Sequence, residues 1–401
     1  MVRTMSAAAE RILTPISNHE LERRWTATRR EMRDRGIDAL IMQATNDWLG
    51  GCVKWFTDLP ATNGYPRTVI FYADEPMTMV EMGPFGSQHT LDGKDPGYRG
   101  VGERLLTPSF HSIAYTHDYD AQLAVAALRR RPHRTVGLIA EGAMPHAFVA
   151  GIKSSLTNTS FVNATEFIDR LKAIKSPEEI ALIRRTAEMQ DAVFAKVLAS
   201  IRPGQRDVDI TALAQYEGQR LGSEQGIFLG GSSPTGQRSP FVPRSMQGRT
   251  LREGDQLSLL IENNGPGGFY TELARTIVLG RASNELSDGF EAVKQAQAHT
   301  LSAMRPGTPC RDVAAAHDAF MKQWGLPLEL RLYAHGQGYD MVERPLIRRD
   351  ETMSLEIGMC LAVHPGYETP SLFAVICDNY LMEADGPSAC LHRTPKKIFE
   401  L

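Results

Sequence analysis

The sequence predicts a small α/β domain followed by a larger domain made of two similar halves. Three observations lead to this prediction. Strands alternate with helices early in the chain, a strong helix start lies near its middle, and one helix–turn–helix pattern occurs twice. The chain has 401 residues, which is enough for more than one domain. We therefore expect an N-terminal α/β domain over residues 1–165 and a C-terminal domain over residues 166–401.

The N-terminal region alternates between helical and extended patterns. Residues 18–36 form a charged amphipathic pattern that is typical of a helix. Apolar runs with a strand pattern follow, and their sequences are IDALIMQ, TVIFYADEPMTMVEM and TVGLIAEG. The segment AQLAVAALRRR, between the last two runs, predicts a further helix. Because strands and helices alternate, this region is expected to form an α/β domain.

The clearest helix start in the chain lies just after the predicted domain boundary. Ser176 suits the N-cap position, Pro177 the first helical position and Glu179 the third, which together make a capping box. The apolar residues that follow recur largely at helical spacing. The Arg-Pro-Gly sequence at 202–204 predicts the end of this helix.

A pattern that occurs twice indicates an internal duplication. The segment IRPGQRDVDITA at 201–212 is similar to MRPGTPCRDVAAA at 304–316. Each segment follows one predicted helix and precedes another, and both contain Arg-Pro-Gly and Arg-Asp-Val. The distance between the two copies is too long for a solenoid repeat and suits a duplicated half-domain.

The bulk composition gives no indication of nucleic-acid or membrane partners. The net charge is −3, so no basic surface for nucleic acid is expected. No apolar run approaches the roughly 20 residues of a membrane helix. The N-terminus has no sustained apolar stretch of the kind found in signal peptides. The five cysteines are widely spaced with no CxxC pair, which predicts a reduced, cytoplasmic protein.

Four segments in the second half resemble the creatinase/prolidase/aminopeptidase P family. They are LKAIKSPEEIALIRRTAEM, GGFYTELARTIVLG, LYAHGQGYDMVERP and GMCLAVHPGYE, in family order between Leu171 and Met382. The resemblance implies the pita-bread fold, an α+β domain of duplicated halves whose antiparallel sheet is flanked by helices. The N-terminal region is similar to the smaller α/β domain of that family.

The resemblance also implies where metal ligands would lie. Metal-dependent members of the family hold two divalent ions with two Asp, one His and two Glu. Counting back along the chain puts the first Asp position at Ile261. The resemblance puts the other four positions at Glu272, His335, His364 and Cys377, with Asp378 as the alternative for the last one. Since Ile261 cannot bind a metal and neither His364 nor Cys377 is a bridging carboxylate, we expect no two-metal centre.

Three functions remain open at this point. The favoured one is a creatinase-like hydrolase or lyase that cleaves a C–N bond of a small anionic or zwitterionic metabolite. It would use no metal cofactor, with His335, His364 and Glu272 as catalytic residues. The second is an Xaa-Pro peptidase-like hydrolase with a single zinc or other metal, held by Glu272, His335, His364 and Cys377. The third is a non-catalytic binding protein of the same fold.

Further residues are candidates for binding a small-molecule substrate. Arg238 and Arg344 suit a substrate carboxylate, because a guanidinium group can donate two parallel hydrogen bonds to it. The resemblance further implies a homodimer in which the N-terminal domain contributes to the neighbour's site. The complete set of substrate-binding candidates is Arg238, Glu262, Glu343, Arg344, Cys377, Tyr65 and Arg67.

Overall fold

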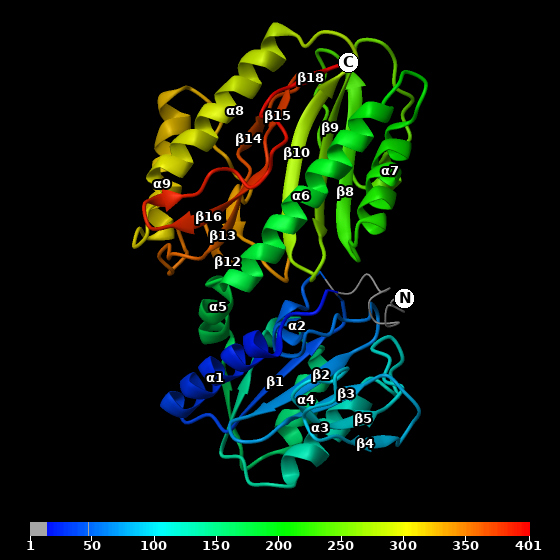
Figure 1. Ribbon diagram of the computed structural model, residues 1–401, viewed down its shortest axis with the longest axis vertical. Coiled ribbons are helices and arrows are strands. Elements are labelled where there is room, and N and C mark those ends of the chain that lie inside the picture. Colours follow the sequence, from blue (N-terminus) through cyan, green and yellow to red (C-terminus); the bar gives the residue numbers. More distant parts are fainter. Residues whose placement is uncertain (1–13, 47) are drawn as a thin grey trace, which may run out of the picture. The chain divides into compact units, whose positions relative to one another are not determined.

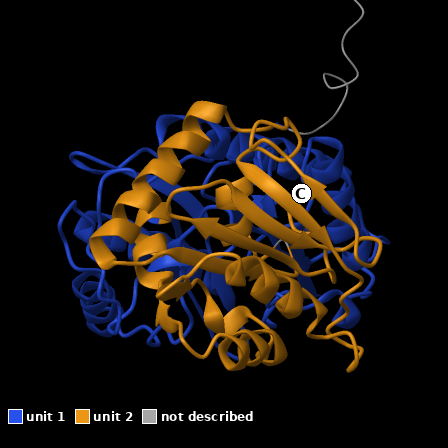
Figure 2. Cartoon of the chain, turned by 90° about the horizontal axis from the view of Figure 1, so that it is seen from below, with its two compact units in different colours: residues 1–14, 173–401 blue, residues 15–172 orange. Residues whose placement is uncertain are grey.

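The computed structural model describes residues 14–46 and 48–401 (Figure 1). The described chain divides into two compact units, one of which is Pro15–Lys172, while the other contains Ala173–Leu401 (Figure 2). Helix α5 (Thr165–Ala173) lies at this division, and the boundary predicted after residue 165 falls at its start.

The N-terminal unit is built on one mixed sheet of seven strands in the order β4-β5-β3-β2-β1-β6-β7. Its strands are β1 (Ala39–Ala44), β2 (Arg67–Tyr72), β3 (Met77–Glu81), β4 (Gln88–Thr90), β5 (Val101–Leu106), β6 (Thr135–Leu138) and β7 (Ser160–Asn163). Its helices are α1 (Asn18–Arg35), α2 (Gly51–Thr57), α3 (Tyr119–Arg129), α4 (His146–Ser155) and the short 3₁₀ helix η2 (Glu141–Ala143). The predicted α/β pattern of strands and helices is confirmed.

The predicted first helix is also confirmed, and its ends have clear physical causes. The side chain of Ser17 accepts a hydrogen bond from the backbone N–H of Glu20, which satisfies one of the free donors at the helix start. Gly36 ends the helix at a φ of 65°, a left-handed conformation that glycine adopts without steric cost.

The C-terminal unit contains two main sheets flanked by helices (Figure 1). The first half consists of α6 (Pro177–Ser200), α7 (Asp207–Arg220), β8 (Gly226–Pro234), η3 (Arg244–Met246), β9 (Asp255–Asn264) and β10 (Tyr270–Val278). The second half begins with α8 (Asn284–Ala303), α9 (Cys310–Gln323), β11 (Ala334–Gly336), β12 (Glu343–Leu346), β13 (Cys360–Val363) and β14 (Gly366–Glu368). It ends with β15 (Phe373–Val375), β16 (Asp378–Glu383), β17 (Gly386–Pro387) and β18 (Phe399–Glu400). Both main sheets are antiparallel except where β10 pairs with the short strand β18 in parallel.

The two halves have the same order of elements, and equivalent hydrogen bonds occur within each half. The N–H of Gly204 donates to the carbonyl of Leu251, and the N–H of Gly307 donates to that of Leu355. Both glycines follow Arg-Pro, and their φ values of 90° and 87° lie in the left-handed region that favours glycine. The duplication predicted from the repeated Arg-Pro-Gly segment is therefore visible in the backbone.

The sheet of the first half has a hydrophobic face that packs against helices α6 and α7. Ile261 and Leu273, from β9 and β10, belong to a buried cluster with Val193 and Phe194 of α6 and Ile210 of α7. Since successive side chains on a strand point to opposite faces, Glu262 and Glu272, the chain neighbours of the two strand residues, face away from these helices. That opposite face carries the polar residues of the candidate site.

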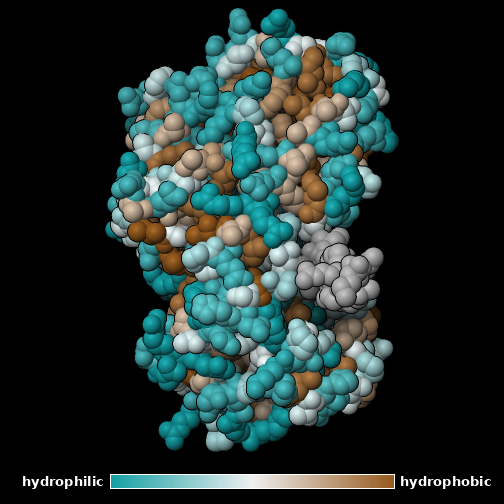
Figure 3. Space-filling view, viewed as in Figure 1, coloured by the Kyte–Doolittle hydropathy of each residue, from teal (hydrophilic) through white to brown (hydrophobic). Residues whose placement is uncertain are grey.

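No helix among the described residues combines the length and the apolar character needed to cross a lipid bilayer. On the face drawn in Figure 3, hydrophilic and hydrophobic side chains are interspersed.

The predicted capping box at the start of α6 is present. The Ser176 hydroxyl accepts from the N–H of Glu179, and the Glu179 carboxylate accepts from the N–H of Ser176. We expect Ser176→Ala to lower the free energy of unfolding by about 1 kcal/mol, because it removes one of these bonds. Chemical denaturation would measure this loss. Ser176→Asp keeps an acceptor at the cap and serves as the control, so equal stability of the Ala and Asp variants would contradict the prediction.

Candidate functional site

The candidate site lies where the two sheets of the C-terminal unit meet. An isolated antiparallel bridge between Ala274 of β10 and Cys377 links the first sheet to the second, beside the pairing of β10 with β18. The backbone N–H of Glu272 reinforces this junction by donating to the side chain of Asn379 on β16, over 2.7 Å. Residues from β9, β10, β11, the end of β13 and the start of β16 therefore meet at one place.

Glu262 and Glu272 lie directly opposite each other on β9 and β10. Residues opposite each other on antiparallel strands project from the same face, so the two carboxyl groups are neighbours. Ile261 instead points into the hydrophobic cluster under α6 and α7. The placement of the first acidic position at Ile261 is wrong, because it assumed a fixed number of residues in the turn between the strands. The pairing puts Glu262 there.

His335, on β11, presents one ring nitrogen to the site. Its Nδ1 lies 2.8 Å from the carbonyl oxygen of Gly336, which can only accept a hydrogen bond. Nδ1 therefore carries the proton, and the lone pair is left on Nε2. This Nε2 lies 4.0 Å from Oε1 of Glu272, and the His335 side chain is buried.

His364 follows β13 and approaches the same carboxylate. Its Nε2 lies 3.4 Å from Oε1 of Glu272, and its ring packs edge-on against that of His335 with the centroids 5.1 Å apart. This Nε2 atom is buried and has no hydrogen-bond partner among the described residues. A buried polar atom without a partner is costly, which indicates that it faces a position for a ligand.

Cys377 is the fourth donor beside Glu272. Its Sγ lies 2.8 Å from Oε1 of Glu272 and donates a hydrogen bond to it. The thiol is buried, at 2% exposure, so the sulfur is reached only from within the site. Nitrogen, oxygen and sulfur donors thus surround one carboxylate oxygen.

The pKa values of the two glutamates are shifted in opposite directions. Burial and the neighbouring charge of Glu272 raise the pKa of Glu262 well above its usual range. Burial also opposes ionisation of Glu272, but the nearby His364 and His335 outweigh it and lower the pKa of Glu272. Burial lowers the pKa of His364 to about 4. Burial and then the charge of Glu272 raise the pKa of Cys377 well above its usual range.

Three of these residues suit a single metal ion. Glu272, His335 and His364 each offer one ligand atom, and the three atoms lie within 4.8 Å of one another. Two imidazole nitrogens and one carboxylate are a normal ligand set for zinc, and a cysteine sulfur is a common fourth ligand. A pair of ions needs several bridging carboxylates, and only Glu262 and Glu272 supply carboxyl groups at these five positions. The donors therefore fit one ion better than two.

Two candidates for substrate binding are held in ion pairs of their own. Glu343 is buried and lies 2.7 Å from Nζ of Lys175, whose side chain is 3% exposed. Arg344 pairs with both carboxylate oxygens of Glu351 and also donates to the hydroxyl of Thr352 at 2.9 Å. Binding of substrate by Glu343 or Arg344 stays a prediction. Each side chain would have to bind the substrate beside its present ion-pair partner or give up that ion pair.

The other candidates lie on exposed or separate parts of the chain. Arg238 is half-exposed on the loop after β8, and its Nη1 lies 3.4 Å from Oε1 of Glu368. Tyr65 and Arg67 belong to the N-terminal unit, where Arg67 pairs with Glu81 at 3.1 Å. Their contribution to substrate binding stays a prediction.

The structure adds Gln337 and Asn379 to the site, two residues that the sequence analysis did not select. The Gln337 amide donates to Oε1 of Glu262 over 3.1 Å, and the Asn379 amide donates to Oε1 of Gln337 over 2.7 Å. The available signal was a large polar residue between two glycines, Gly336 and Gly338.

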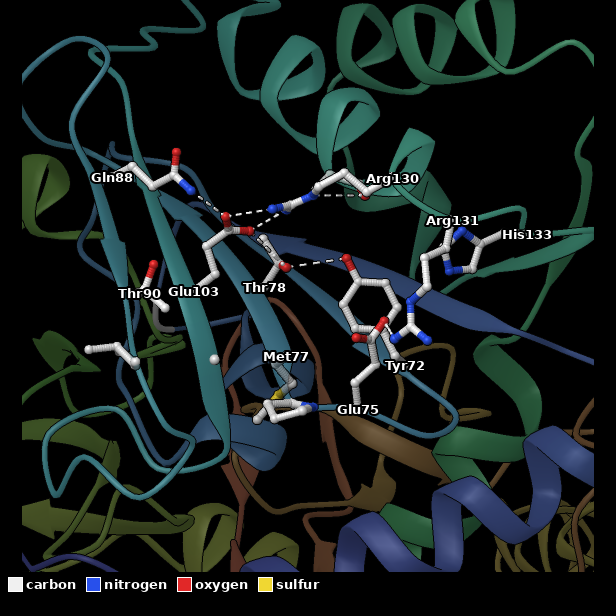
Figure 4. Close-up of a pocket in the computed structure, with 14 residues that line it drawn as sticks. Tyr72, Glu75, Met77, Thr78, Gln88, Thr90, Glu103, Arg130, Arg131 and His133 are labelled. Atoms are coloured by element: carbon white, nitrogen blue, oxygen red, sulfur yellow. Dashed lines mark hydrogen bonds and ion pairs between the residues drawn. The ribbon is translucent and has the colours of Figure 1, made fainter.

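A separate cavity of about 450 Å³ lies in the N-terminal unit (Figure 4). Its charged groups are paired with one another. Arg130 donates to both oxygens of Glu103, which also accepts from Gln88 at 2.7 Å, and Arg131 pairs with Glu75. This cavity contains no ligand set comparable to that around Glu272.

Known proteins resemble the chain in sequence and in fold. The sequence profile of metallopeptidase family M24 matches residues 181–384. The Xaa-Pro dipeptidase of Pyrococcus furiosus is 23% identical over 66% of this chain and 75% of its own length. The probable dipeptidase PepE of Mycobacterium bovis is 25% identical over 59% of this chain, and that match spans 63% of PepE.

Solved structures support the same fold. A recombinant prolidase from Thermococcus sibiricus superimposes with a TM-score of 0.77 at 17% identity, covering 96% of this chain and all of that one. The X-Pro aminopeptidase of Thermotoga maritima gives 0.75 at 15% identity, with 94% and 99% covered. The predicted pita-bread fold and the predicted family resemblance are confirmed.

These comparisons correct the favoured function. The matched relatives are named dipeptidases, and the matching profile describes metallopeptidases. The prediction of a creatinase-like, metal-independent enzyme acting on a non-peptide C–N bond is therefore wrong, as is the statement that the chain is not an ordinary metallopeptidase. The replaced ligand positions suggested loss of metal, but Glu262 had been assigned to substrate binding, and histidine and cysteine are themselves metal ligands.

The buried ion pair between Lys175 and Glu343 allows a prediction about the stability of the fold. Lys175→Met should lower the free energy of unfolding by about 3–5 kcal/mol, because it removes the ammonium group 2.7 Å from a buried carboxylate. Adding Glu343→Gln to that variant should restore much of the loss. Lys153→Met is the control, since its partner Glu141 is exposed and such pairs contribute about 0–1 kcal/mol. Equal losses in the two single variants, measured by denaturant unfolding, would contradict burial as the cause.

Proposed function

Because the chain belongs to metallopeptidase family M24, we propose that it is a metal-dependent dipeptidase and that Xaa-Pro dipeptides are its substrates. The observation that carries the proposal is the convergence of Glu272, His335 and His364 within 4.8 Å of one another. The convergence lies inside the segment that matches the family profile. The substrate class is suggested by matched relatives that are named Xaa-Pro dipeptidase.

Glu272, His335 and His364 would hold one divalent ion, preferably zinc, and Cys377, whose Sγ donates to the same Oε1 of Glu272, would supply the fourth ligand. Softer sulfur and nitrogen donors favour zinc over manganese or magnesium. When bound, such an ion supplies Lewis-acid polarisation of a peptide carbonyl and lowers the pKa of a bound water.

The protein's own residues prepare this arrangement before any ion binds. The carbonyl of Gly336 fixes the His335 tautomer, so that Nε2 offers its lone pair. Asn379 holds the backbone of Glu272 at the junction of the two halves, which sets the direction of the carboxylate. The unpartnered Nε2 of His364 completes the set from the second half.

The remaining expectations are part of the same proposal. Arg238 is the better placed arginine for a dipeptide carboxylate, because its side chain is 53% exposed and its ion pair is long. A homodimer in which Tyr65 and Arg67 approach the neighbour's site, and a cytoplasmic location, are further parts of it.

The proposal is tested by hydrolysis of Xaa-Pro dipeptides with protein stripped of metal and then reloaded with zinc or manganese. His335→Ala and His364→Ala should each lose zinc and reduce kcat/KM by at least about 100-fold, because metal polarisation contributes several kcal/mol. His299→Ala, which removes a half-buried histidine stacked on Phe320, is the matched control and should retain both zinc and activity.

Two results would contradict the proposal. One is full activity of the stripped wild-type protein in the presence of a chelator. The other is normal zinc content in both His335→Ala and His364→Ala, which would place any bound ion elsewhere in the chain.

A further inference from the structure

Two buried amides extend from the junction of the halves to Glu262. Gln337 and Asn379 are both fully buried, at 0% exposure, and neither is a metal ligand in the site described above. Their side chains form a chain of hydrogen bonds that begins at the backbone of Glu272 and ends at the carboxyl group of Glu262.

The first hydrogen bond of this network fixes which amide group donates and which accepts in each of the others. The backbone N–H of Glu272 can only donate, so the Asn379 atom that faces it, 2.7 Å away, must be the carbonyl oxygen Oδ1. The Asn379 NH₂ group then points to Oε1 of Gln337 at 2.7 Å. Gln337 is left with its own NH₂ group toward Glu262, 3.1 Å from Oε1. Neither amide can reverse without losing a buried bond.

A hydrogen-bond donor at Glu262 has a consequence for metal binding. A cation binds through oxygen lone pairs, whereas the Gln337 NH₂ group presents hydrogens with positive partial charge at the same carboxyl oxygen. Glu262 lies opposite Glu272 and would otherwise be the natural ligand for a second ion beside the first.

We propose that Gln337 and Asn379 are positioning residues whose fixed amide direction occupies Glu262 with a donor and limits the site to one ion. This inference rests on the proposed function, since it concerns the number of ions beside Glu272. It assigns a role to the polar residue between Gly336 and Gly338 and to the asparagine two residues after Cys377.

Two variants test the proposal, because each replaces the hydrogen-bond donor that faces Glu262 by an acceptor. Gln337→Glu replaces the donor by a carboxylate oxygen of nearly the same shape. Asn379→Asp keeps the acceptor for the Glu272 N–H but removes the donor to Gln337, so that the Gln337 amide turns and its carbonyl faces Glu262. Gln337→Met removes the donor without adding a ligand atom, so it separates the release of Glu262 from the gain of a new ligand.

The full-length variants are first loaded with one equivalent of zinc and then titrated with Mn²⁺, with free Mn²⁺ followed by electron paramagnetic resonance. Wild type should take up little Mn²⁺. Gln337→Glu and Asn379→Asp should each bind about one further equivalent, because oxygen ligands now face a shared position. Gln337→Met should bind Mn²⁺ more tightly than wild type, because Glu262 no longer faces the donor, but more weakly than the acidic variants, because it adds no ligand atom. Mn²⁺ should also raise the thermal unfolding temperature of these variants but not that of wild type, since a ligand that binds the folded state stabilises it.

The results separate this inference from the proposed function. If wild type binds one zinc that His335→Ala loses, but neither acidic variant gains Mn²⁺ or is stabilised by it, the inference is overturned and the proposed function stands. Uptake of Mn²⁺ by zinc-loaded wild type would also overturn the inference. A wild-type protein that holds no zinc would instead contradict the proposed single-ion site.

Discussion

The pairing of β9 with β10 is the constraint on which the candidate site depends. The register of these strands places Glu262 opposite Glu272 and, by the alternation of side chains, sends Ile261 and Leu273 into the core under α6 and α7. A shift by one residue would bury both carboxyl groups among apolar side chains and expose the apolar residues on the other face. The packing of the helices therefore fixes the position of the acidic pair.

The duplicated fold supplies the remaining donors from the second half. The bridge between Ala274 and Cys377 brings the start of β16 beside β10, and β11 and β13 carry His335 and His364 to the same place. In a site built between two halves, each ligand lies on or directly beside a different strand, so the ligands are held close to sheet hydrogen bonds and not on long loops. This rigidity explains how buried polar atoms such as Nε2 of His364 can be kept without a protein partner.

Local patterns were enough to predict much of the fold. The capping box at Ser176 and the repeated Arg-Pro-Gly segments depend on neighbouring residues, and both predictions are confirmed. The family motifs selected Glu272, His335, His364 and Cys377, which the structure brings together. Counting along the chain failed at Ile261, because the length of one turn decides which residue faces the site. The partners of Glu343 and Gln337 depend on residues distant in sequence, so no local pattern could give them.

The central claim is that one ion binds at Glu272 between the two histidines and the cysteine. X-ray absorption at the zinc edge of the loaded protein tests it most directly. We expect one sulfur at about 2.3 Å and two imidazole nitrogens at about 2.0–2.1 Å from zinc. A metal–metal distance of about 3.5–4 Å, or a shell with neither sulfur nor imidazole, would contradict it.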